Sequence, residues 1–267
     1  MQKISVLGCG WLGLPLAKKL ICSDFIVNGS TTTSEKLSKL EDAGIVPFII
    51  SLTEEGISGE VREFLKDSEV IIINIPPKLR SVSSENFVAK MERLIPFIEK
   101  SSVQKVLFVS STSVYGNKDG VITEEIIPEP NTESGKQLLQ TEKLLQSNSS
   151  FKTTILRFGG LIGEDRHPVK YLAGKENIES PDAPINLIHQ KDCIEVISKI
   201  IGSDVWGETF NAVAPFHPTR KEYYTQKALE MNLALPKFTE SIISTSKIIK
   251  SDKLIERLGH QFALDLY

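Results

Sequence analysis

Cysteine, histidine and excess basic charge are all scarce in this chain of 267 residues. The three cysteines, Cys9, Cys22 and Cys193, show no Cys-x-x-Cys spacing, and the four histidines are scattered, so no metal-binding motif is present. We therefore expect no metal site, and reduced thiols in a cytoplasmic protein. Thirty-one Lys and Arg residues against 34 Asp and Glu residues give a net charge of -3, which disfavours nucleic acid as a partner.

A long hydrophobic run is also missing. No segment approaches the roughly 20 consecutive apolar residues that a membrane helix needs, and the first residues pass directly into a strand-like segment. We expect neither a membrane partner nor export. The 40% hydrophobic and 24% charged content is typical of a globular protein and excludes a disordered or fibrous chain.

Short apolar runs recur along the first 110 residues, and each is followed by a polar segment with helical spacing. The alternation predicts an α/β fold, a doubly wound parallel sheet (Rossmann fold). One run, Val70–Ile75, is apolar almost throughout, so helices should cover both faces of the sheet. The expected strands are Ile4–Leu7, Phe25–Asn28, Val46–Ile50, Val70–Ile75 and Val106–Ser110, and the stripe Phe87, Met91, Leu94, Ile95 and Ile98 predicts a buried helix face.

The regular alternation breaks after Gly163, where residues 164–185 are polar and contain prolines. Strand and helix patterns return later in the chain, which suggests a second unit assembled from separate pieces. We expect a Rossmann domain of residues 1–163 and 186–215, and a smaller, discontinuous C-terminal substrate lobe of residues 164–185 and 216–267.

A glycine-rich motif, Gly8-Cys9-Gly10-Trp11-Leu12-Gly13, follows the first expected strand and opens a helical segment. In this context a G-x-G-x-x-G pattern is typical of dinucleotide binding. Gly8 permits a tight turn, Gly10 lets the backbone approach a pyrophosphate, and Gly13 allows close helix packing. The helix N-terminus adds N–H donors and a positive dipole end. The expected cofactor-binding residues of this loop are Gly8, Gly10, Trp11, Leu12 and Gly13.

The second expected strand ends in Ser30-Thr31-Thr32-Thr33, with hydroxyls and no carboxylate. A carboxylate here accepts hydrogen bonds from the ribose of NAD and repels the 2′-phosphate of NADP. Glu35 is near, but Thr32-Thr33-Ser34-Glu35 fits a capping box, in which Glu35 bonds to the start of its own helix. Thr31, Thr32 and Lys36 therefore favour NADP, with NAD as the alternative.

Four motifs follow one another along the chain, at Gly8–Gly13, Asn74-Ile75-Pro76-Pro77, Ser110–Gly116 and Arg157–Gly163. In this order they resemble the extended short-chain dehydrogenase/reductases, in the NAD(P)-dependent sugar-nucleotide epimerase/dehydratase branch. The resemblance covers nearly the whole chain, and its most specific part is Ser-Ser-x-x-Val-Tyr-Gly after a strand. It implies that Asn74 and Pro76 contact the cofactor.

The resemblance also implies catalytic positions. In that family a Ser or Thr four residues before the Tyr of Val-Tyr-Gly orients the substrate oxygen, and Ser111 matches it. A Tyr-x-x-x-Lys pair normally follows, in which Tyr is the acid/base and Lys binds the nicotinamide ribose. Lys136 matches the Lys, but Thr132 stands at the Tyr position, and its hydroxyl cannot titrate near neutral pH. Tyr115 remains a candidate proton donor, with the pocket wall as its alternative role.

Four other polar residues are candidates for a functional or a structural role. Arg157 and Arg166 flank the Gly-x-x-Gly stretch, where the resemblance places the mouth of the substrate cleft, and arginine suits phosphate binding. We expect Arg166 to bind substrate, with a solvated loop charge as the alternative. Asp192 with Glu195 has the capping-box form and should begin a helix, and His189 should be a hydrogen-bonded structural residue.

Two functions remain open from the sequence. The first is an NAD(P)-dependent oxidoreductase or epimerase acting on a sugar-nucleotide-like or other carbonyl or carbinol substrate. The second is a non-catalytic NADP-binding sensor that reports to a partner, which the missing Tyr favours. Ser111 and Lys136 favour the enzyme. A hydroxyacid-type dehydrogenase, suggested by the stretch Gly8–Ala17, is disfavoured by the Val-Tyr-Gly segment.

Overall fold

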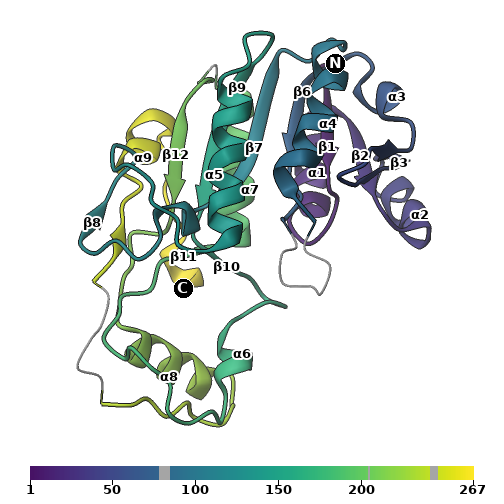
Figure 1. Cartoon of the computed structure of the whole chain (residues 1–267). Helices are drawn as coiled ribbons and strands as arrows, with labels where there is room; N and C mark the ends of the chain where they lie inside the picture. The colour runs from purple at the N-terminus through teal and green to yellow at the C-terminus, as the bar shows by residue number, and fades with distance from the viewer. Residues whose placement is uncertain (78–84, 204, 241–245) are drawn as a thin grey trace.

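A seven-stranded parallel sheet forms the centre of the computed structural model, which describes residues 1–77, 85–203, 205–240 and 246–267 (Figure 1). Every neighbouring pair in this sheet is parallel. From edge to edge the strands are β12 (Thr209–Ala212), β9 (Lys152–Phe158), β7 (Lys105–Ser111), β6 (Ser68–Ile73), β1 (Lys3–Leu7), β2 (Ile26–Thr31) and β3 (Val46–Ile49). This order confirms the predicted doubly wound sheet.

Helices cover both faces of the sheet, as the apolar run in β6 predicts. Ile71 and Ile73 pack into the core on one face, and Val70 and Ile72 into the core on the other. The first face is covered by α3 (Val61–Leu65), α4 (Phe87–Glu99) and α5 (Glu133–Gln146). The second is covered by α1 (Gly13–Ile21), α2 (Leu37–Glu41), α7 (Gln190–Gly202) and α9 (Asp252–Leu258).

The predicted helical stripe is buried in α4. Asn86 caps this helix by accepting a hydrogen bond from the Ala89 amide at 3.1 Å, and the apolar side chains at positions 87, 91, 94, 95 and 98 all pack against the sheet. No helix among the residues with a described position has the length and apolar character needed to cross a membrane.

A smaller lobe lies apart from the sheet, where Figure 1 shows α6 (Val169–Leu172) and α8 (Arg220–Glu230) at the lower end of the molecule. These helices share an apolar core that includes Val169, Tyr223 and Tyr224. Short elements complete the fold: η1 (Ser34–Lys36), β4 (Ser51–Leu52) with β5 (Ile57–Ser58), η2 (Thr112–Tyr115), β8 (Val121–Ile122) with β13 (Ile248–Ile249), β10 (Gly160–Ile162) with β11 (Leu187–His189), and η3 (Leu264–Leu266).

The C-terminal segment packs against the sheet. Leu254 of α9 is buried in one core with Phe210 of β12 and Val196 of α7, and β13 pairs with β8. The expected domain boundaries stay a prediction, and this packing favours assigning residues 248–258 to the sheet unit instead of the smaller lobe.

Candidate cofactor and substrate site

The glycine loop turns sharply after β1 and is fixed from two sides. Gly8 has φ = +102°, where a side chain is strained, and a Cβ there would lie 2.6 Å from the Asn74 carbonyl oxygen. The Gly8 amide donates to Ser30 Oγ at 2.9 Å, and Asn74 Nδ2 donates to the Gly8 carbonyl at 3.1 Å. A Cβ on Gly13 would lie 2.1 Å from the Gly8 oxygen, so only glycine lets α1 begin this close to β1.

Gly10 stands on the open side of the same loop. Apart from its chain neighbours, no heavy atom in the part of the chain that the structure describes lies within 4 Å of the place that a Cβ would occupy. A cavity of about 470 Å³ borders it, and α1 begins three residues later. The first N–H groups of a helix have no intrahelical partner and carry positive partial charge. The site therefore fits a dinucleotide with its pyrophosphate beside Gly10; the other predicted residues on the cavity wall are Gly8, Thr31, Thr32, Asn74 and Pro76.

Asn74 follows β6 and forms hydrogen bonds to the end of β1 and to the glycine loop. Its amide donates to the Leu7 carbonyl at 2.9 Å, and its side chain is committed to Gly8. From β1 the strand order runs to β2 on one side and to β6 on the other, so the strand order reverses at this point. Open α/β sheets bind ligands at such a switch point, outside the carboxyl ends of the strands. Asn74 thus shapes the loop, whereas Pro76 supplies wall surface.

The predicted capping box at the end of β2 is wrong. Thr33 is the N-cap of η1, but its side chain caps no amide, and Glu35 is exposed. The Thr33 amide donates to Thr31 Oγ1 at 3.2 Å, so the turn is closed from the preceding strand. The helix also begins with a single 3-10 turn, whose spacing differs from that of an α-helical capping box. Lys36 lines the cavity together with Thr31 and Thr32.

Ser111 is the last residue of β7, which lies next to β6 in the sheet. Its Oγ accepts from the Ser113 amide at 3.2 Å and so caps η2. The hydroxyl proton remains available to a ligand. Because β1, β6 and β7 are parallel neighbours, Ser111 lies at the same carboxyl end of the sheet as Gly8 and Asn74.

Tyr115 is fully buried and its hydroxyl already has two partners. It donates to Asn211 Oδ1 at 2.9 Å and accepts from Arg157 Nη1 at 2.7 Å. Burial raises the pKa of Tyr115, although the Arg157 charge opposes the shift. A side chain without exposed surface cannot meet a substrate, so this placement argues against both the proton-donor role and the pocket-wall role.

Thr132 and Lys136 lie at the start of α5. Thr132 is the N-cap, with Oγ1 accepting from the Gly135 amide at 3.1 Å, so its hydroxyl serves the helix. Lys136 is exposed and is absent from the lining of the cavity at Gly10, whereas Leu138 packs inward. Ribose binding by Lys136 stays a prediction, and its exposed position fits the alternative of a surface lysine.

The two candidate arginines have different environments. Arg157 is 6% exposed and forms an ion pair with Glu142, Nη2 to Oε2 at 2.6 Å, so its charge is already matched inside the protein. Arg166 is exposed, and its guanidinium carbon lies 5.0 Å from the centre of the Trp11 ring. Substrate binding by Arg166 stays a prediction.

Asp192 does not cap α7, so that capping-box prediction is also wrong. The N-cap is His189, whose side chain accepts from the backbone two residues on, as a structural histidine would. Asp192 accepts from the Tyr267 hydroxyl at 2.6 Å, and Glu195 pairs with Lys19 at 3.0 Å. Partners distant in sequence replace the local cap that the spacing suggested.

Sequence reasoning missed residues that hold the glycine loop in place. The Ser30 hydroxyl receives the Gly8 amide, and Gln190 Nε2 donates to the Trp11 carbonyl at 2.7 Å. The hydroxyls at the end of β2 predict ligand binding, whereas the Ser30 hydroxyl supports the loop. No local signal identifies Gln190, because it lies 179 residues from Trp11.

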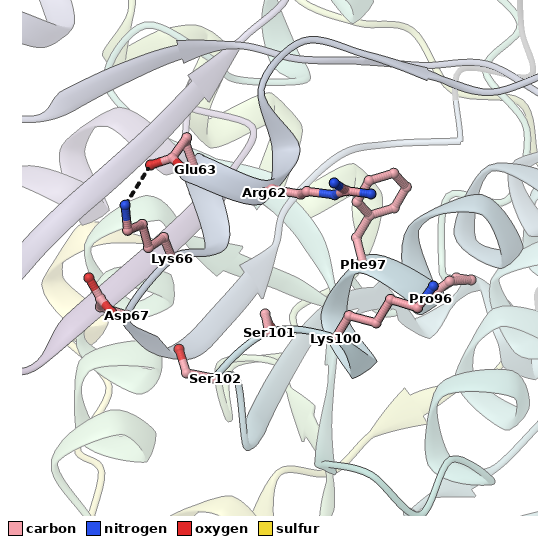
Figure 2. Close-up of a pocket in the computed structure, with 9 residues that line it drawn as sticks. All are labelled: Arg62, Glu63, Lys66, Asp67, Pro96, Phe97, Lys100, Ser101 and Ser102. Carbon is pink, nitrogen blue, oxygen red and sulfur yellow. Dashed lines mark hydrogen bonds and ion pairs between the residues drawn. The ribbon is translucent and has the colours of Figure 1, made fainter.

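A separate cavity of about 570 Å³ lies where β6 begins and α3 and α4 end, and Figure 2 shows its lining. Its two carboxylates already have partners: Glu63 pairs with Lys66 at 3.3 Å, and Asp67 pairs with Lys3 at 3.6 Å. Cations near helix C-termini are stabilised by the helix dipole, which explains the positive residues here without a ligand. None of the predicted site residues lines this cavity; its cations are Arg62, Lys66 and Lys100.

A parallel sheet with a glycine loop at its central strand and an open cavity beside that loop defines a dinucleotide-binding Rossmann protein. A family model described as NAD(P)H-binding matches residues 8–201. The chain therefore belongs to the NAD(P)H-binding family, and the resemblance to the short-chain dehydrogenase/reductases is confirmed.

Among curated relatives, Protein YeeZ of Escherichia coli K12 is 31% identical over 98% of this chain and 96% of its own length. An uncharacterized UDP-glucose epimerase, YtcB of Bacillus subtilis, is 25% identical over 79% of this chain and 76% of its own.

Solved structures share the fold. A Thermotoga maritima UDP-glucose 4-epimerase with UDP-glucose has a TM-score of 0.81 at 18% identity, covering 98% of this chain and 94% of that one. A Bacillus cereus UDP-glucuronic acid 4-epimerase in complex with NAD has a TM-score of 0.79 at 18% identity, covering 98% of this chain and 92% of that one.

Proposed function

We propose that this protein is an NADP-dependent oxidoreductase or epimerase that acts on a carbonyl or carbinol carbon of a sugar-nucleotide-like substrate. The observation that carries the proposal is the position of Ser111 at the carboxyl end of the sheet, where the glycine loop also lies. Related proteins support the substrate class, because one is named a UDP-glucose epimerase and solved neighbours contain UDP-sugars.

Each residue of the site has a distinct task in this proposal. The loop at Gly10 and the start of α1 hold the pyrophosphate, while the bound nicotinamide supplies the hydride chemistry. Ser111 donates its hydroxyl proton in a hydrogen bond to the substrate oxygen and so stabilises charge that develops there. Tyr115 is buried and Thr132 caps α5, so we assign proton exchange to solvent.

The test is a panel of carbonyl compounds and nucleotide sugars. NADPH consumption is followed by absorbance, and isomer formation from nucleotide sugars by chromatography. Substrate-dependent turnover supports the enzyme. Tight NADPH binding without turnover across the panel supports the sensor, which Thr132 at the usual Tyr position favours.

Replacing Ser111 with Ala is expected to lower turnover by about 10²–10³-fold, because one donor to the developing charge is lost. NADPH affinity should stay unchanged. Ser113→Ala is the matched control, since only the backbone amide of Ser113 is used in the cap. Equal turnover by wild type and Ser111→Ala would contradict the catalytic assignment.

Lys36→Ala is expected to weaken NADP binding about tenfold and to leave NAD binding unchanged, because Lys36 is the cation beside Thr31 and Thr32. Fluorescence titration with both reduced cofactors measures the effect. Glu35→Gln is the companion variant. If the wild type prefers NAD and Glu35→Gln removes that preference, Glu35 binds the ribose and the NADP assignment is wrong.

A further inference from the structure

The Trp11 side chain joins the glycine loop to the chain segment that leads into the smaller lobe. Its indole Nε1 donates to Asp165 Oδ1 at 2.7 Å, and the Arg166 guanidinium lies over its ring at 5.0 Å. Gln190 holds the Trp11 carbonyl at 2.7 Å. One residue of the loop is thus held from two distant segments.

The segment after β10 is shaped to receive the indole. Gly163 and Arg166 exchange backbone hydrogen bonds at 2.8 and 3.1 Å, which closes a tight turn with Asp165 at its tip and Arg166 at its base. A Cβ on Gly163 would lie 2.8 Å from Trp11 Cζ2, so the ring rests directly on that backbone. This close fit distinguishes the contact from a chance surface pair.

The held residue is part of the expected pyrophosphate site. Trp11 directly follows Gly10, and Leu12 is the N-cap of α1. A second cavity, of about 440 Å³, borders Gly10 on this side and is lined by Trp11, Lys36 and Asp165. The direction of the first amides of α1 depends on how the loop is held, and phosphate binding by such amides requires a fixed direction.

We propose that Asp165 and Arg166 are positioning residues for the cofactor, acting through the Trp11 indole on the amides that hold the pyrophosphate. The inference rests on the proposed binding of NADP at the glycine loop. It gives Arg166 a role on the cofactor side of the site in place of the predicted contact with substrate. It also makes cofactor affinity depend on a segment that belongs to the entry of the smaller lobe.

A double-mutant cycle tests the proposal on the full chain, with NADPH affinity measured by nucleotide fluorescence. Trp11→Phe keeps a ring but loses the indole N–H, and Asp165→Ala loses the acceptor. Each single variant should weaken NADPH binding about tenfold, and the double variant should be little worse than either. Asp165→Asn keeps an acceptor oxygen and should restore most of the affinity. Arg166→Ala should weaken binding, and Arg166→Lys should weaken it less.

The control and the spectroscopic readout separate positioning from folding. Glu176→Gln removes an exposed carboxylate that does not line the cavities beside Gly10 and whose partner is exposed Lys237 at 2.5 Å, so this variant should bind NADPH like the wild type. The chain has two tryptophans, so Trp206→Phe leaves Trp11 as the sole indole reporter, and its emission should shift when Asp165→Ala is added. Unchanged affinity in Asp165→Ala and Arg166→Ala would overturn the proposal, whereas a wild type that binds no NADPH would overturn the proposed function.

Discussion

Substitution of Gly10 by Asp is expected to abolish dinucleotide binding while the protein stays folded. Among the residues with a described position, no atom lies within 4 Å of a Cβ built here, so the new side chain clashes with none of them. It instead puts a carboxylate where the pyrophosphate must lie. Two like charges about 4 Å apart repel by about 4 kcal/mol at an effective dielectric constant near 20, which corresponds to an affinity loss of about a thousandfold. NADPH fluorescence titration measures the loss, and thermal unfolding confirms the fold.

Gly202 provides the matched control for this variant. It is the last residue of α7, and a Cβ there also meets no atom of the described residues within 4 Å. Gly202→Asp adds the same charge away from the glycine loop, so NADPH affinity should remain at the wild-type value. If Gly10→Asp bound NADPH as tightly as Gly202→Asp, the pyrophosphate would not lie beside Gly10.

The fold could be predicted because its signals are local and repeated. The run at Val70–Ile75 is apolar almost throughout, and in the structure β6 has cores on both faces. The glycine loop was equally clear, since Gly8 and Gly13 meet backbone constraints that glycine alone satisfies. Periodicity and glycine spacing depend on nearest neighbours in the chain, so a single sequence contains them in full.

The helix starts could not be predicted from spacing, although both had the capping-box form. Glu35 and Glu195 stand at the right distance from a hydroxyl or carboxylate, yet neither caps its helix. Thr31 closes the first turn from inside β2, and the Tyr267 hydroxyl binds Asp192 from the end of the chain. Asp192 has a partner from a distant part of the chain, and the turn before Glu35 is closed by a residue that precedes the four-residue pattern. The spacing within either pattern contains neither partner.

The site was predicted only in part, because some of its contacts join residues that lie far apart in the sequence. The motifs indicated which strand ends carry the functional residues, and Ser111 does end β7. The burial of Tyr115 depends on Arg157 and Asn211, which lie 42 and 96 residues away. Its role therefore could not be judged until the fold brought these side chains together.

A buried polar network supports the strand end that carries Ser111. Glu142 of α5 is 1% exposed and accepts from Arg157 of β9 and from the Ser110 hydroxyl at 2.6 Å. Arg157 also donates to the Tyr115 hydroxyl in η2. Burial lowers the pKa of Arg157, but its bonds to Glu142 outweigh burial, so the net pKa is raised and the guanidinium stays charged.

Arg157→Met is expected to lower the free energy of unfolding by about 3–5 kcal/mol, because it leaves the buried Glu142 carboxylate without its cation. That is a large share of the roughly 5–15 kcal/mol that stabilises a typical domain, so this single substitution should destabilise the protein strongly. Urea unfolding followed by circular dichroism measures the change. Adding Glu142→Leu should recover part of the loss, since the unpaired charge is then removed and an apolar side chain fills its place.

The exposed pair of Lys118 with Glu129 is the control for this prediction. Their side chains meet at 2.9 Å, but the Glu129 side chain is 68% exposed, so water solvates the carboxylate when its partner is removed. Lys118→Met should therefore change the free energy of unfolding by less than about 1 kcal/mol. The nitrogen–oxygen distances of the two ion pairs are similar, so a difference between the two variants reports the effect of burial. An effect of Arg157→Met no larger than that of Lys118→Met would show that the network does not stabilise the strand end at Ser111.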